Sequence, residues 1–159
     1  MSASPRKAKN TDPVHRNYAR RTRTSAEPTI VIAEDHDDTR EVLGLLFRTW
    51  ACRVVEARDG LEAVDAATRE HPALILMDGS LPYLDGLAAA RQIRKNKLLG
   101  DVKIVALNGW GTPSYTVDAF AAGCDDCLIK PLDFERLRIH LNDLGLSLGM
   151  DQQSKSPRI

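Results

Sequence analysis

The chain has 159 residues with a formal net charge of zero, 43% hydrophobic and 28% charged residues, a composition typical of a globular protein with about one domain of ~100–200 residues. Its longest aliphatic run, residues 73–77, is far shorter than the roughly 18 residues that cross a bilayer, and no apolar signal region follows the basic N-terminal segment. Composition thus argues against a membrane protein, and we expect a cytoplasmic protein without a membrane partner.

Residues 1–28 differ in charge from the rest of the chain. They carry seven Lys or Arg residues against Asp12 and Glu27, a net charge of +5 that the other 131 residues balance with −5. With three prolines and few aliphatic residues, this segment cannot bury enough apolar surface to offset its ordering entropy, which predicts a disordered basic tail. Tyr18 is its only aromatic residue, so a solvated extension is favoured over a nucleic-acid arm.

From residue 29 onward, short apolar strands alternate with amphipathic helices. In chain order we predict a strand at 29–33, a helix at 38–49, a strand at 53–57, a helix at 61–70, a strand at 73–78, a helix at 86–96, a strand at 102–108, a helix at 113–122, a strand at 126–129 and a helix at 134–144. Asp59 and Asp85 fit helix N-caps, and Gly123 fits a helix end.

Five strands that alternate with five helices predict an α/β domain at residues 29–144. Parallel strands need crossover connections, so the sheet should be parallel, with helices on both faces. Residues 145–159 lose the helical period and are expected to form a flexible C-terminal tail.

Polar side chains stand where four of the strands end. Glu34 and Asp35 follow the first strand, Asp78 ends the third, Asn108 ends the fourth and Lys130 follows the fifth. The carboxyl ends of parallel strands meet at one edge, which is the ligand crevice of an open α/β sheet. Three carboxylates there repel one another by about 4 kcal/mol per pair at about 4 Å, with an effective dielectric constant near 20. The pattern therefore predicts a bound cation in addition to Lys130.

The acidic cluster predicts a hard divalent cation and phosphoryl chemistry. Oxygen ligands, with no Cys or His in an evident ligand position, favour Mg²⁺ or Mn²⁺ over Zn²⁺. Mg²⁺ takes one or two carboxylates plus substrate phosphate, which leaves Asp78 able to act as a nucleophile toward a phosphoryl group. Lys130 would neutralise a second phosphoryl oxygen.

The three cysteines, Cys52, Cys124 and Cys127, are an odd number and argue against a disulfide framework. Cys124 and Cys127 form a CxxC pair, which could be a redox dithiol or half of a zinc site. Because no second pair of ligands accompanies it, we expect buried, inert thiols instead.

Residues 29–144 resemble the receiver domain of two-component response regulators. The likeness rests on the acidic pair Glu34-Asp35, the segment MDGSLPYLDG that begins one residue before Asp78, and the segment GCDDCLIKPLD that contains Lys130. It implies a flavodoxin-like, doubly wound five-stranded sheet of order 2-1-3-4-5. It also implies that Asp78 accepts a phosphoryl group from a histidine kinase or histidine phosphotransfer protein, so that the chain acts in signalling and not as an enzyme.

The resemblance also implies roles for individual residues. Asp35, Asp78 and the backbone carbonyl of Ser80 would hold Mg²⁺, with Glu34 assisting through water. Lys130 would contact the phosphoryl group, and its bond to the following proline would be cis.

Two positions depart from the receiver pattern. The fourth strand of receiver domains usually ends in Thr or Ser, whose hydroxyl moves to the phosphoryl group, but here it ends in Asn108. The fifth strand usually carries Tyr or Phe, which swings inward with that movement, but here it carries Cys127. An Asn amide can donate to a phosphoryl oxygen. We therefore expect the phosphorylation chemistry to be retained and the conformational output to be weak or differently routed.

Three functions follow from these observations. The leading one is a single-domain response regulator, because the fifteen residues after residue 144 are too few for an output module. It would contact a downstream protein, or pass phosphate along a relay, through the face of its fourth helix, fifth strand and fifth helix. Asn108 and Cys127 leave open a non-switching adaptor that acts by binding alone. A phosphatase of the haloacid dehalogenase type is disfavoured, because Ser80 stands where that enzyme needs an acid/base Asp.

Trp110 lies two residues beyond Asn108 and has two interpretations. It anchors its loop to the neighbouring helix by buried area, or its indole obstructs the water that would hydrolyse phospho-Asp78. The second interpretation predicts a slowly hydrolysing aspartyl phosphate.

Overall fold

The computed structural model describes residues 27–146 and 148–149. Its elements in chain order are β1 (Thr29–Ala33), α2 (Asp37–Thr49), β2 (Arg53–Ala57), α3 (Gly60–Glu70), β3 (Leu74–Asp78), α4 (Gly86–Lys95), the 3-10 helix η1 (Lys97–Leu99), β4 (Lys103–Asn108), α5 (Pro113–Ala121), β5 (Asp126–Ile129) and α6 (Phe134–Asp143). Every predicted strand and helix is present, with each end within one residue of its prediction; η1 was not predicted. The predicted basic tail lies almost entirely outside the described residues.

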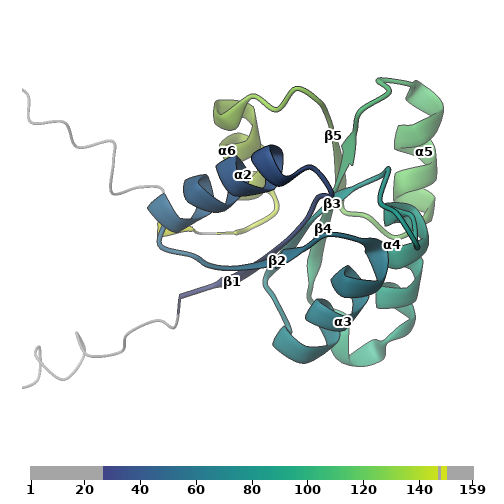
Figure 1. Ribbon diagram of the computed structural model, residues 1–159, viewed down its shortest axis with the longest axis horizontal. Coiled ribbons are helices and arrows are strands. Elements are labelled where there is room, and N and C mark those ends of the chain that lie inside the picture. The colour runs from purple at the N-terminus through teal and green to yellow at the C-terminus, as the bar shows by residue number, and fades with distance from the viewer. Residues whose placement is uncertain (1–26, 147, 150–159) are drawn as a thin grey trace, which may run out of the picture.

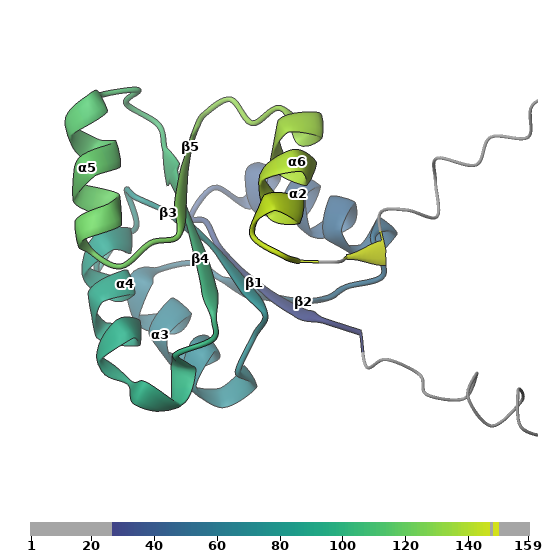
Figure 2. The ribbon, with the colours of Figure 1, turned by 180° about the vertical axis from the view of Figure 1, so that it is seen from behind.

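The five strands are parallel and lie in the order β2-β1-β3-β4-β5, which confirms the expected order. All five residues of the central strand β3 are buried, as its uninterrupted apolar run predicts. Helices α2 and α6 cover one face of the sheet, and α3, α4 and α5 cover the other (Figures 1 and 2). None of the helices in the described ranges is both long and apolar enough to cross a membrane.

An apolar core lies between the sheet and the helices on each of its two faces. Successive side chains of β1 point alternately into one core and the other. Ile30 and Ile32 lie in the core beneath α2 and α6, while Val31 and Ala33 lie in the core beneath α3, α4 and α5. Because a slip of one residue would exchange the two sets, both cores fix the register of β1. The ends of the strands, and the polar residues that follow them, are fixed with it.

The start of α4 explains why glycine and aspartate come soon after β3. Asp85 caps the helix, accepting a hydrogen bond from the backbone N–H of Ala88 at 2.9 Å, as predicted. The N–H of Gly86 donates to the carbonyl of Gly79 at 3.1 Å. A Cβ at Gly86 would overlap the backbone carbonyl of Asp78, so only glycine lets the helix begin this close to the strand end.

The segment after α6 corrects one expectation. Leu148 is buried in the core beneath α2 and α6, and Leu146 packs against that core. The N–H of Gly149 donates to the carbonyl of Trp50 at 3.0 Å. The prediction of a flexible tail from residue 145 is therefore wrong for Leu146 and Leu148, which are held by apolar packing, and for Gly149, which is held by its hydrogen bond to Trp50. Residue 147 and residues 150–159 of that tail lie outside the described residues.

Candidate functional site

The sheet brings together the polar residues at the ends of β1, β3 and β5. The ammonium Nζ of Lys130 lies 2.7 Å from Oε2 of Glu34 and 3.5 Å from Oδ1 of Asp78. Glu34 is fully buried, and Asp78 is 2% exposed. One lysine thus bridges two buried carboxylates that stand 44 positions apart in the chain.

Burial and charge shift the proton affinities of this group. Burial, and next the charge of Glu34, raise the pKa of Asp78, while Lys130 and the Ser80 N–H oppose that rise. Burial lowers the pKa of Lys130, but its hydrogen bond to Glu34 and the charge of Asp78 outweigh burial, so that the pKa is raised. Lys130 therefore stays an ammonium, and a cation near Asp78 would favour the ionised form of its carboxyl group.

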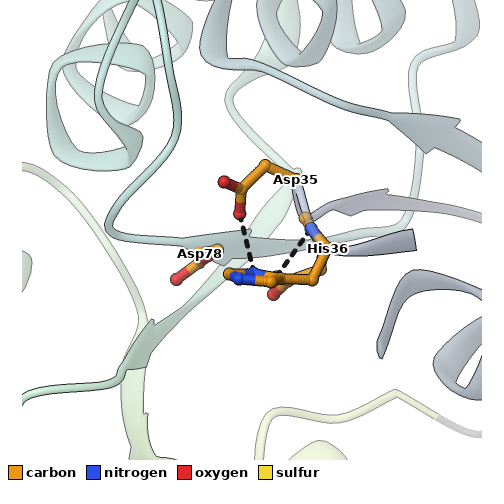
Figure 3. Close-up of side chains that lie close together, drawn as sticks. Asp35, His36 and Asp78 are labelled. Carbon is orange, nitrogen blue, oxygen red and sulfur yellow. Dashed lines mark hydrogen bonds and ion pairs between the residues drawn. The ribbon is translucent and has the colours of Figure 1, made fainter. Parts of the chain in front are cut away.

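Four side chains at this edge offer ligand atoms that lie within 4.8 Å of one another: Glu34, Asp35, His36 and Asp78. Figure 3 shows the His36 ring close to Asp35 and Asp78. Three carboxylates face one ammonium, so the donor set fits a divalent cation that supplies the missing positive charge.

His36 corrects the expectation that no histidine stands in a ligand position. Its Nδ1 lies 3.0 Å from Oε1 of Glu34 and 3.1 Å from Oδ1 of Asp35. The hydrogen bond to Glu34, and next the charge of Asp35, raise the pKa of His36. Its position directly after the acidic pair at a strand end was the available signal.

Ser80 lies beside Asp78 as expected. Its backbone N–H is 3.5 Å from Oδ1 of Asp78, and its hydroxyl is 3.4 Å from Oδ2, both at the long limit of hydrogen bonding. The metal-binding role of its carbonyl stays a prediction. The Lys130–Pro131 peptide bond is cis, as the resemblance implied.

A model of the family described as the response regulator receiver domain matches residues 30–142, which include every residue of this site. The chain belongs to the response regulator receiver domain family. Receiver domains are signalling domains of two-component phosphorelay systems, and no enzyme family is indicated for this chain.

Similar proteins include regulators and solved receiver domains. The transcriptional regulatory protein SrrA of Staphylococcus aureus is 32% identical over 102 residues, which cover 64% of this chain and 41% of SrrA. The receiver domain of the sensor histidine kinase PA1611 of Pseudomonas aeruginosa PAO1, solved with magnesium in its active-site cleft, is 34% identical, with a TM-score of 0.68 and coverage of 76% of this chain and 99% of that one.

The receiver domain of Saccharomyces cerevisiae Ssk1, solved with the histidine phosphotransfer protein Ypd1, is 29% identical. Its TM-score is 0.69, and the match covers 75% of this chain and 89% of that one. This receiver chain spans about half the length of the curated relatives it matches.

In this receiver domain the side chain of Asn108 is hydrogen-bonded inside its own loop. It is fully buried, and its amide donates to the carbonyl of Thr112 at 3.2 Å. Its Oδ1 accepts from the N–H groups of Trp110 at 2.9 Å and Gly111 at 3.0 Å. One of the two N–H donors of the amide is thus used within the loop, and the expected donation to a phosphoryl oxygen stays a prediction.

Tyr115, on α5, is a residue that the sequence did not single out. Its hydroxyl is buried and has no hydrogen-bond partner within the described part of the receiver domain. A Cβ at Gly79 would clash with this hydroxyl, so the hydroxyl lies against the residue that follows Asp78. Burial, and next the thiols of Cys127 and Cys124, raise the pKa of Tyr115.

Tyr115→Phe is expected to stabilise the domain by about 1 kcal/mol, because a buried hydroxyl without a partner costs roughly 1–3 kcal/mol. Urea unfolding measures the change. Tyr83→Phe is the matched control. Because Tyr83 is 87% exposed, this substitution should leave stability unchanged. A Tyr115→Phe domain no more stable than the wild type would show that the hydroxyl has a partner in solution.

Trp110 makes the contact with the neighbouring helix that the anchoring interpretation expects, but most of its surface is not buried. Its ring lies 5.6 Å from that of Tyr115, centroid to centroid, at an interplanar angle of 53°. The side chain is 60% exposed. The contact joins the loop after β4 to the first turn of α5; shielding of Asp78 stays a prediction.

All three cysteines of the receiver domain are free. Burial raises the pKa of Cys52 to about 11 and that of Cys124 to about 12, and it also raises the pKa of Cys127. The thiols are thus held protonated, which agrees with inert cysteines. The expectation of full burial is wrong for Cys127, which is half-buried on β5 with its sulfur 3.7 Å from the Thr116 hydroxyl.

Proposed function

We propose that this receiver domain accepts a phosphoryl group on Asp78 from a histidine kinase or a histidine phosphotransfer protein, in a Mg²⁺-dependent reaction, and signals through contacts with another protein. The observation that carries the proposal is the position of Asp78. Its carboxylate is buried at the end of β3, within the acidic cluster and 3.5 Å from the Lys130 ammonium.

In the proposed reaction an oxygen of Asp78 attacks the phosphorus of a phosphohistidine. The O–P bond forms as the donor's P–N bond breaks, and its electron pair returns to the imidazole nitrogen, which takes up a proton. Lys130, 3.5 Å from Oδ1 of Asp78, neutralises charge on the transferred group. Asp35, Asp78 and the Ser80 carbonyl, with Glu34 assisting, would hold Mg²⁺, which supplies further charge neutralisation.

Protein partners are supported by the complex of the Ssk1 receiver domain with Ypd1. A groove of about 570 Å³ beside Lys130 offers a place for the phosphodonor; Val42 and Phe134 are among the residues that line it. Val117, Phe120 and Ile129, on α5 and β5, are exposed apolar side chains. They fit contacts with a downstream protein on the face of α5, β5 and α6.

A non-switching adaptor is the second candidate, and the hydrogen bonds of Asn108 favour it. Because its amide and carbonyl both hold the loop that precedes α5, a movement of that loop toward Asp78 would have to break them. Hydrogen exchange with and without beryllofluoride separates the candidates. A switch changes exchange in α5, whereas an adaptor does not.

Trp110→Ala is expected to speed the loss of phosphate from Asp78 if the indole obstructs the hydrolytic water. The half-life of the phosphorylated chain measures this, with exposed Tyr83→Ala as the control. An unchanged half-life would leave Trp110 only its anchoring contact with Tyr115.

The proposed function is tested by incubating the chain with acetyl phosphate and following its intact mass. We expect one phosphoryl group to be gained with Mg²⁺ and none with a chelator in its place. No gain with Mg²⁺ would contradict phosphoryl acceptance and favour the adaptor.

A further inference from the structure

His36 stands at the junction of β1 and α2 but does not act as a helix cap. It occupies the N-cap position of α2, yet its side chain makes no capping hydrogen bond to the described backbone. The ring instead turns back to the acidic pair, with Nδ1 at 3.0 Å from Glu34 and 3.1 Å from Asp35. An imidazole nitrogen therefore lies between two carboxylates of the proposed cation site.

The surroundings of His36 leave its ring free to adjust to an ion. The side chain is 72% exposed, and that of Asp35 is 32% exposed, whereas Glu34 and Asp78 are held in the buried interior. Figure 3 shows the ring beside Asp35 and Asp78. The four ligand atoms lie within 4.8 Å of one another, so small side-chain rotations bring all of them to one ion.

The chemistry of the donor set differs from an all-oxygen site. Mg²⁺ prefers oxygen ligands, whereas Co²⁺ and Ni²⁺ bind imidazole nitrogen readily and rank above Mn²⁺ in affinity for mixed sites. A nitrogen ligand therefore adds affinity for these transition metals without helping Mg²⁺. Mg²⁺ must also displace the ring from the two carboxylates.

We propose that His36 is a fourth protein ligand of this cation site and shifts its selectivity toward divalent transition metals that bind nitrogen. The inference rests on the cation site of the proposed function and concerns which ion occupies it. The competing explanation is that the ring only forms an ion pair with the carboxylates. An ion pair would compete with every divalent cation alike, so its removal would raise all affinities together.

Calorimetric titrations of the full chain with Mg²⁺, Co²⁺ and Ni²⁺ at one fixed pH separate these explanations. We expect His36→Ala to weaken Co²⁺ and Ni²⁺ binding by about tenfold or more, the size of effect that even outer-shell changes produce, while Mg²⁺ binding stays equal or tightens. The visible spectrum of the Co²⁺ form should shift in the same variant, because a nitrogen ligand is lost. His71→Asn is the control, since His71 is exposed, is not among the clustered ligands, and has a positive φ that Asn tolerates.

Two results would overturn the inference in distinguishable ways. Equal changes for all three ions in His36→Ala, with an unshifted Co²⁺ spectrum, would reject the nitrogen ligand alone. If Asp35→Asn leaves Mg²⁺ binding intact, or the wild type binds none of the ions, the cation site of the proposed function fails together with the role of His36.

Discussion

Lys130→Met is expected to lower the free energy of unfolding by about 3 kcal/mol in metal-free solution. Glu34 is fully buried, and the Lys130 ammonium 2.7 Å away is its nearest cationic partner, ahead of the His36 ring at 3.0 Å. Removing one member of a buried ion pair leaves an uncompensated charge, which costs roughly 3–5 kcal/mol. We expect the lower end, because the Lys130 side chain is 24% exposed and water can reach the site.

A double variant provides the internal control. Glu34→Gln removes the charge that Lys130→Met leaves unpaired, so the combined variant should recover most of the lost stability. Urea unfolding of the two single variants and the double variant gives the coupling directly. If Lys130→Met costs less than about 1 kcal/mol, or if the double variant is less stable than Lys130→Met, the buried pair does not hold this edge of the sheet together.

Mg²⁺ is expected to stabilise the wild type by RT ln(1 + [Mg²⁺]/Kd), about 2.7 kcal/mol at a hundredfold excess over Kd. The ion relieves a repulsion among carboxylates that exists only where the fold gathers them. Asp35→Asn should abolish most of this gain, because Asp35 is the exposed carboxylate of the cluster. Denaturant unfolding with and without Mg²⁺ measures the difference.

The stability of Asp35→Asn without metal shows whether the substitution simply damages the fold. Without metal, Asp35→Asn should be as stable as the wild type or more stable, since one repelling charge is gone. Asp118→Asn, an exposed acid on α5 outside the cluster, should keep the full Mg²⁺ effect. Equal Mg²⁺ stabilisation in Asp35→Asn and the wild type would place the ion elsewhere.

The strands and helices could be predicted because their signals are local. The run from Leu74 to Met77 is apolar at every position, and all four side chains are buried. Asp59 and Asp85 cap helices as their positions indicate. The meeting of Glu34 and Asp78 followed from one rule, that the ends of parallel strands share an edge.

The features that could not be predicted from the sequence depend on the direction and packing of side chains. The spacing of apolar residues along the chain carries no information about either. His36 turns toward the acids from an extended backbone, with φ −81° and ψ 118°. The hydroxyl of Tyr115 lies against Gly79 because Gly79 has no side chain. Leu148 lies beyond the last helical period, so its burial appears only once α2 and α6 form the core that receives it.

The resemblance to receiver domains supplied the strand order, but it did not predict the contacts of residues that depart from the family pattern. Asn108 is hydrogen-bonded to Thr112 and to its own loop, an arrangement that the family pattern of Thr or Ser does not describe. At this position the conformation of the side chain therefore follows from its own hydrogen bonds and could not be taken from the family motif.

The most direct test of phosphoryl acceptance is to locate the phosphoryl group. The chain is incubated with acetyl phosphate and Mg²⁺, the acyl phosphate is reduced with borohydride, and the modified residue is found by peptide mass spectrometry. The account predicts that Asp78 alone is converted to homoserine and that Asp78→Asn gives no modified peptide. Modification of another carboxylate, or unchanged labelling of Asp78→Asn, would contradict it.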